Sequence, residues 1–199
     1  MGMKYLILDI LIGGLKMKKT EIKEIVNNSI EQKNLCRFFF RYDNNYFYYF
    51  PLCANDKLFL GAEEDDFIID GYSIRRFIDV TKVQSKDDKC LEILKNEGII
   101  DSIKKPNIDI SNWETVFNSL KLLNKNVIIE KESLDDDEWD FVIGRIDKVY
   151  KNFVYVYHFD ADGIWQEEHY KIHYTAITSV SFGTRYVEVF SKYLDELHI

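Results

Sequence analysis

Residues 141–159, FVIGRIDKVYKNFVYVYHF, form the clearest structural pattern in the chain. In Phe153–Tyr157 valine alternates with aromatic residues, which is the period of a β-strand covered on both faces. Lys151 and Asn152 separate this strand from the preceding one, and two residues suffice for a tight hairpin turn. Gly144 permits a sharp bend in the preceding strand. We therefore expect a strongly bent antiparallel hairpin.

Further elements extend this hairpin in both directions. A second turn is expected at Asp160–Gly163, and a break of one 3₁₀ turn at Thr175–Ala176 carries the chain into a last strand. A helix begins at the candidate N-cap Ser111, where Glu114 would complete a capping box, and another begins at Thr184. The second half is predicted to have strands at 127–131, 141–150, 153–159, 167–174 and 178–182, and a closing helix at 184–197.

The order of these elements is that of a small barrel. A helix, four strands joined by hairpins, a one-turn break and a fifth strand resemble the Sm-like and SH3-like barrels. Ile143–Val149 followed by Asn152–Val156 is similar to the first half of an Sm-type motif, in which glycine permits the strand bend. The resemblance implies the fold alone, because the paired Asp/Asn and Arg-Gly residues with which Sm proteins hold uridine are not recognisable here.

The first half of the chain repeats this order of elements. Thr20–Asn27, with Thr20 as a candidate N-cap, aligns with Ser111–Asn118, and both segments have apolar residues at helical spacing. Further matches pair Tyr72–Ile74 with Tyr170–Ile172 and Val80–Val83 with Ile177–Val180. The alternative is that two ordinary α+β segments align by chance.

We therefore predict an α+β fold, mostly β, built by tandem duplication of a helix, a five-stranded small bent barrel of Sm-like or SH3-like type, and a second helix. The predicted parts are a first unit at 17–98, a linker at 99–110 and a second unit at 111–199.

An aromatic hairpin dominates the first unit. Phe38–Tyr42 and Tyr46–Phe50 flank residues 43–45, Asp-Asn-Asn, which tolerate turn conformations. Strand alternation places on one face Tyr46, Tyr48 and Phe50, and on the other Phe47 and Tyr49. Because a small barrel has one interior, the second aromatic face needs a cover of its own. We expect a helix, the other barrel or a second copy to supply it, with the two units packed through their aromatic faces.

Residues 1–16 have two interpretations. Tyr5–Leu15 is apolar but interrupted by Asp9, and it is shorter than the ~20 residues that a membrane span needs. Residues 13–16, Gly-Gly-Leu-Lys, directly precede Met17. The codons of the two glycines can spell a bacterial ribosome-binding site at the usual spacing before a start codon at Met17. On this interpretation 1–16 is a mis-annotated extension and the native chain begins at Met17. The alternative is a helix or strand that docks onto the fold.

Composition and charge limit the class of protein. With 46% apolar and 30% charged residues, the 199-residue chain can bury a core. The net charge of −8 argues against whole-surface affinity for nucleic acid or an anionic membrane, and leaves room for a local basic patch. Three scattered cysteines fit a reducing cytoplasm. The Lys-, Ile- and Asn-rich, Pro-poor composition suggests an AT-rich bacterial genome, so we expect a cytoplasmic bacterial protein without membrane association.

Acidic and aromatic residues supply the first candidate binding residues. Asp135, Asp136 and Asp137 belong to an acidic run that either docks a basic partner or forms a solvated hairpin tip. Tyr46 and Tyr48, on one face of the aromatic hairpin, are candidates for contact with a partner.

Arg75 and Arg76 supply the second set. Together with the adjacent Phe77 they form the best basic-aromatic patch in the sequence, of a kind that binds single-stranded nucleic acid. The alternative interpretation is that both arginines pair with the acidic hairpin of their own unit, at 63–66.

The sequence contains no recognisable catalytic motif. It has no nucleophile elbow, no glycine-rich phosphate loop and no zinc-protease motif. His169 and His173 are the candidates for metal ligands, but residues four apart on a strand are separated by about 13 Å. We therefore predict no catalytic residues, no metal and no cofactor.

These observations favour a non-enzymatic protein that acts by binding another protein or a second copy of itself, in a regulatory, immunity or defence-modulating role. The alternative is an Sm-like nucleic-acid-binding protein that uses the patch at Arg75 and Arg76. The net charge of −8 disfavours that alternative.

Overall fold

The computed structural model describes residues 17–43 and 45–195, so both interpretations of residues 1–16 lie outside the described residues. The fold is α+β and mostly β, as predicted. The first half contains α2 (Lys19–Gln32), β1 (Cys36–Phe40), β2 (Tyr46–Ala54), β3 (Leu58–Asp65), β4 (Ile68–Arg76), the 3₁₀ helix η1 (Phe77–Asp79), β5 (Val80–Ser85), α3 (Lys89–Asn96) and α4 (Ile99–Ser102). The second half contains α5 (Trp113–Leu123), β6 (Asn126–Lys131), η2 (Asp136–Glu138), β7 (Asp140–Val149), β8 (Phe153–His158), β9 (Tyr170–His173), β10 (Ser179–Phe182) and α6 (Arg185–Phe190).

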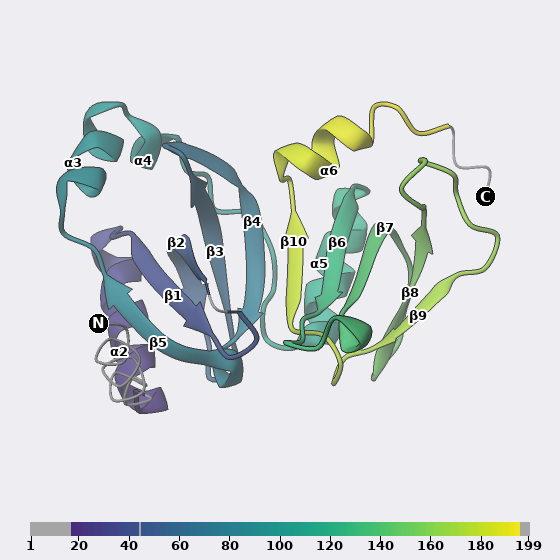
Figure 1. Ribbon diagram of the computed structural model, residues 1–199, viewed down its shortest axis with the longest axis horizontal. Coiled ribbons are helices and arrows are strands. Elements are labelled where there is room, and N and C mark those ends of the chain that lie inside the picture. The colour runs from purple at the N-terminus through teal and green to yellow at the C-terminus, as the bar shows by residue number, and fades with distance from the viewer. Residues whose placement is uncertain (1–16, 44, 196–199) are drawn as a thin grey trace, which may run out of the picture.

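These strands form one open antiparallel sheet in the order β5-β1-β2-β3-β4-β10-β6-β7-β8-β9. The second half thus follows the strand order of the first, and Figure 1 shows the two bent halves side by side with β4 and β10 between them. β4 and β10 pair from Arg75 opposite Ser179 to Tyr72 opposite Phe182. The expected packing of two barrels through aromatic faces is therefore wrong, because the backbone groups of two edge strands join the halves.

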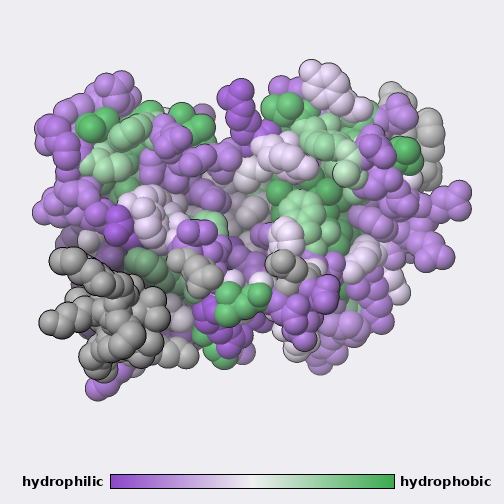
Figure 2. Space-filling model, viewed as in Figure 1, coloured by the Kyte–Doolittle hydropathy of each residue, from purple (hydrophilic) through white to green (hydrophobic). Residues whose placement is uncertain are grey.

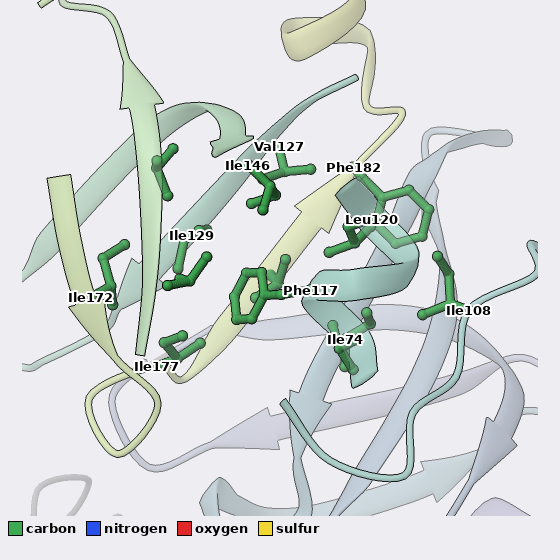
Figure 3. Packing of buried hydrophobic residues seen from close by; sticks show 14 of the residues in the cluster. Ile74, Ile108, Phe117, Leu120, Val127, Ile129, Ile146, Ile172, Ile177 and Phe182 are labelled. Atoms are coloured by element: carbon green, nitrogen blue, oxygen red, sulfur yellow. The ribbon is translucent and has the colours of Figure 1, made fainter. Parts of the chain in front are cut away.

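A shared hydrophobic core also links the halves. Phe117 and Leu120 of α5 point into the sheet of the second half, and Ile74 of β4 and Phe182 of β10 belong to the same cluster (Figure 3). Ile108, within the predicted linker, is buried there too. Each large apolar side chain buried in this way stabilises the fold by roughly 1.5–3 kcal/mol, so the halves share much of their stability.

The aromatic hairpin of the first half is covered on both faces at its inner end. Tyr49 packs with Phe38 and Phe59 in a cluster beneath α2, whereas Phe50 packs in a second cluster with residues of α3 and α4. Tyr49 and Phe50 are each 1% exposed, which confirms the prediction of two-sided packing at these positions. Tyr46 at the outer end remains 47% exposed.

The helix ends differ from the expected ones. The N-cap of α5 is Asn112, which forms a capping box with Thr115, because Ser111 instead donates its hydroxyl to Asp109. The predicted cap at Thr20 is also wrong: α2 begins at Lys19, and its N-cap residue Lys18 forms no side-chain capping bond.

The predicted end of the closing helix is also corrected. α6 is capped by Thr184 as expected, but it ends at Phe190 and not at 197. The predicted break before β10 is present: residues 174–176 form a turn in which the amide of Ala176 donates to the carbonyl of His173 at 2.9 Å, the i→i+3 pattern of a 3₁₀ turn. The 3₁₀ helix η1 carries the chain into β5 of the first half.

The predicted hairpin of β7 and β8 is confirmed. The amide of Tyr150 donates to the carbonyl of Phe153 at 3.0 Å across Lys151 and Asn152. At Gly144 a Cβ atom would lie 1.9 Å from the carbonyl oxygen of Tyr157. Only glycine therefore allows the two strands to approach this closely at the bend.

Among the described residues, no helix has the length and apolar character needed to cross a membrane. On the face shown in Figure 2, hydrophilic residues cover most of the described surface, and apolar residues gather in separate areas on the two halves.

Candidate functional site

Small side chains on one face of the β4–β10 pair leave a hollow between the halves. Ser73 and Ser181 face each other there, and the Ser181 hydroxyl donates to the Ser73 hydroxyl oxygen at 3.1 Å. The resulting cavity, of about 290 Å³, is here called the acidic hollow. Its walls include Asp43, Glu63, Arg75, Glu130, Glu132 and Trp139. Four carboxyl groups thus surround one guanidinium group.

Arg75 is the only cation in the wall of the acidic hollow among the described residues, and its side chain is 3% exposed. Its Nη2 atom lies 2.9 Å from Oε1 of Glu132, so the ion pair joins the two halves. The guanidinium group also lies 3.9 Å from the ring centre of Phe40. The expectation that Arg75 pairs with the acidic hairpin at 63–66 is therefore corrected, and Arg75 presents almost no surface to nucleic acid.

The four carboxyl groups of the hollow carry more negative charge, when ionised, than the single positive charge of Arg75 can compensate. Burial, with smaller contributions from Asp70, Asp65 and Glu130, raises the pKa of Glu63 to about 7 although Arg75 opposes the shift. Glu63 has no side-chain hydrogen bond or ion pair within residues 17–43 and 45–195. Burial also raises the pKa of Glu130, and the charge of Glu132 adds to that effect. A cation entering the hollow would therefore be stabilised.

The segment between β6 and β7 carries an exposed surface next to this hollow. Trp139 lines the hollow and is 50% exposed, and its ring lies 6.1 Å from that of the exposed Phe141. Asp135 and Asp137 are exposed in the same segment, and Asp136 begins η2. Asp135 and Asp137 thus share this exposed segment with Trp139, which was not expected from the sequence as a site residue.

Tyr46 and Tyr48 lie elsewhere. Nη2 of Arg37 donates to the Tyr48 hydroxyl at 2.6 Å, and the guanidinium carbon lies 4.3 Å from the ring centre of Tyr46. Their sequence neighbours Phe47 and Tyr49 line the acidic hollow. The structure therefore does not bring Tyr46 and Tyr48 together with Asp135–Asp137, because strand alternation sends them to the opposite face.

A second, larger hollow of about 760 Å³ occurs at the same junction. This junction groove is lined by Lys23, Lys57, Arg76, Phe77, Trp113, Lys151 and Tyr174, among other residues. Arg76 is engaged within the protein: its Nε atom lies 2.5 Å from Oδ2 of the buried Asp79, and its Nη2 atom donates to the Tyr42 hydroxyl at 2.9 Å. Its expected partner, the acidic hairpin at 63–66, is thus replaced by Asp79.

The two histidines have separate partners. Nδ1 of His169 lies 2.8 Å from Oδ2 of Asp147, whereas the ring of His173 lies 5.6 Å from that of Phe153. In the part of the chain that the structure describes, no three histidine, cysteine or carboxylate side chains are arranged to hold a metal ion. The two histidines therefore do not form a common site.

Comparison with known proteins finds no matching family model, no matching curated protein and no similar solved structure. Glu130, Glu132 and Trp139 were not predicted from the sequence as site residues. One signal was available, because Glu130 and Glu132 stand two residues apart after a buried apolar run and so share a face.

Proposed function

We propose that this chain is a non-enzymatic cytoplasmic bacterial protein that acts by binding a basic protein partner, in a regulatory, immunity or defence-modulating role. The proposed docking surface is the acidic hollow together with Asp135, Asp137 and Trp139. One observation carries the proposal: Glu63 is half-buried without an ion pair or hydrogen bond to a described residue, and the hollow that contains it lies beside an exposed tryptophan.

The chemistry of the hollow favours an arginine or lysine side chain of the partner. A cationic head group can pair with Glu63 and Glu130, while its aliphatic stem packs against Trp139. Exposed tryptophans are also the residues on which binding energy tends to concentrate at protein interfaces. Because the pKa of Glu63 is about 7, its carboxyl group becomes fully charged only above neutrality. Affinity for such a partner is expected to rise from about pH 6 to about pH 8.

The test starts with capture of the partner from native lysate on the immobilised protein, with and without nuclease. The captured protein is then purified, and its Kd is measured against wild type, Trp139→Ala, Glu63→Gln and the control Glu168→Gln, which removes an exposed carboxylate outside the hollow. We expect Trp139→Ala to weaken binding about 30-fold, Glu63→Gln to weaken it less, and the control to leave it unchanged. Nuclease-sensitive capture, or equal affinity of all variants, would refute the proposal.

The nucleic-acid alternative draws no support from Arg75 and Arg76, since each is held in an ion pair within the protein. The nuclease arm of the same experiment distinguishes it from protein binding.

We further propose that the two halves arose by duplication of one Sm-like unit. The repeated strand order supports this origin. Relatives with better preserved halves should show identities at the aligned positions, such as Tyr72 with Tyr170 and Val83 with Val180; halves that share only strand order would argue for convergence.

A further inference from the structure

The junction groove differs in charge from the rest of this acidic chain. Its wall holds five basic side chains and two acidic ones, Asp56 and Glu114, although the chain carries a net charge of −8. Both halves contribute: Lys57 stands in the turn between β2 and β3, and Lys151 in the turn between β7 and β8. The groove therefore gathers positive charge from two distant parts of the sequence.

Two of these ammonium groups are available to a ligand. Lys57 and Lys151 are exposed, and their Nζ atoms have no ion pair or hydrogen bond with any described residue. By contrast, the Nζ atom of Lys23 lies 3.1 Å from Oδ1 of Asp56, with which it forms an ion pair. An anion placed between the two turns would meet two uncompensated ammonium groups without breaking an existing ion pair.

The apolar part of the groove is held in position by the shared core. The half-buried ring of Trp113 lies 6.0 Å from Phe117, and Tyr174 stacks on Phe117 at 5.6 Å. The Tyr174 hydroxyl donates to the carbonyl of Tyr150 at 2.6 Å. Phe77, on the other side of the junction, is 2% exposed. Since the partly exposed rings of Trp113 and Tyr174 are fixed by packing, a flat ligand would stack on them with little loss of conformational entropy.

We infer that the junction groove binds a small anionic ligand with a flat ring system, of the chemical class of a mononucleotide. The ring would stack on Trp113 or Tyr174, and the phosphate would pair with Lys57 and Lys151. The volume of about 760 Å³ lies in the range of small-molecule sites. This site shares no lining residue with the acidic hollow. A negative result for ligand binding here would therefore leave the proposed protein binding untouched, and the reverse also holds.

Adenosine 5′-monophosphate (AMP) is the probe for a calorimetric titration of the full chain. We expect saturable binding at one site per chain. Lys57→Gln and Lys151→Gln should each weaken it about fivefold, and adenosine, which lacks the phosphate, should bind at least about tenfold more weakly than AMP. Lys95→Gln, which removes an exposed ammonium group on α3, is the matched control and should leave the Kd unchanged.

Trp113→Ala tests the stacking surface, with an expected loss of about tenfold or more in affinity. Because Trp113 also packs against the core, its melting temperature is measured in parallel; the exposed Lys57 and Lys151 variants should melt as wild type does and keep the test independent of folding. Absence of saturable AMP binding would overturn the inference, as would equal affinities of the two lysine variants and Lys95→Gln. Inorganic phosphate binding as tightly as AMP, or a single-stranded oligonucleotide binding tightly to both lysine variants, would overturn it as well.

Discussion

The acidic hollow and the junction groove lie at the same junction between the halves, yet they hold opposite charge in opposite settings. In the hollow, carboxyl groups are half-buried around Arg75, and burial raises the pKa of Glu63 and Glu130. In the groove, Lys57 and Lys151 stand on turns in contact with water, above rings packed on the shared core. One strand pairing can thus create two sites of different chemistry, because the two faces of the junction carry different side chains.

The largest expected effect is on the groove side of this comparison. Phe117 is fully buried, and it supports both Trp113 and Tyr174. Phe117→Ala should lower the free energy of unfolding by about 3–5 kcal/mol, as measured by urea denaturation. Phe153→Ala, at a partly exposed position on β8, is the comparison variant and should cost less. Equal costs would show that the shared core does not support the groove in the way described.

The next effect concerns the ion pair that joins the halves at the hollow. Arg75→Met leaves the carboxyl group of Glu132 without its partner and should destabilise the protein by about 3 kcal/mol. The double variant Arg75→Met with Glu132→Gln should recover much of that loss, since neither charge then remains uncompensated. Chemical denaturation of the two single variants and the double variant measures the coupling. A double variant as unstable as the sum of the single ones would contradict a direct pair.

A third prediction uses the pH dependence of stability. The pKa of Glu63 is raised in the folded protein to about 7 from an ordinary value of 4.5. The folded state therefore binds this proton more tightly than the unfolded state does. The stability that this bound proton contributes is complete below about pH 4.5 and is lost as the pH rises through about 7, a loss of about 3 kcal/mol.

Glu63→Gln removes this titration. The variant should be more stable than wild type near pH 8, and the difference should shrink toward about pH 5 in urea denaturation at both values. Glu168→Gln, at an exposed position, should show no such pH-dependent difference. A Glu63→Gln difference that is constant with pH would mean that the hollow does not perturb this carboxyl group.

The smallest expected effect tests the start of α5, at the edge of the groove. Asn112 accepts a hydrogen bond from the Thr115 amide at 3.1 Å, so Asn112→Ala should cost about 1 kcal/mol. Ser111→Ala should cost less than about 0.5 kcal/mol, because Ser111 is exposed and does not cap the helix. Thermal melts of both variants compare them directly. A larger loss of stability from Ser111→Ala than from Asn112→Ala would show that Ser111 is the N-cap, as expected from the sequence.

Local patterns in the sequence predicted the hairpins and the order of elements correctly. The alternation in Phe153–Tyr157 and the two-residue turn at Lys151 and Asn152 depend on neighbouring residues alone, so they can be read without knowledge of distant contacts. The cap at Asn112 was missed by one residue, because Ser111 and Asn112 are both good caps and the choice between them depends on the hydrogen bond of Ser111 to Asp109.

The sequence by itself determined the β-rich class, the repeated order of strands and the acidic-aromatic character of the chain. Only the tertiary structure decided that β4 pairs with β10, and that pairing brings Arg75 to Glu132. It also decided that Phe47 and Tyr49 line the hollow while Tyr46 faces away. The physical reason is that strand alternation assigns residues to two faces without saying which face is enclosed, and that the backbone groups of an edge strand can pair with any other edge.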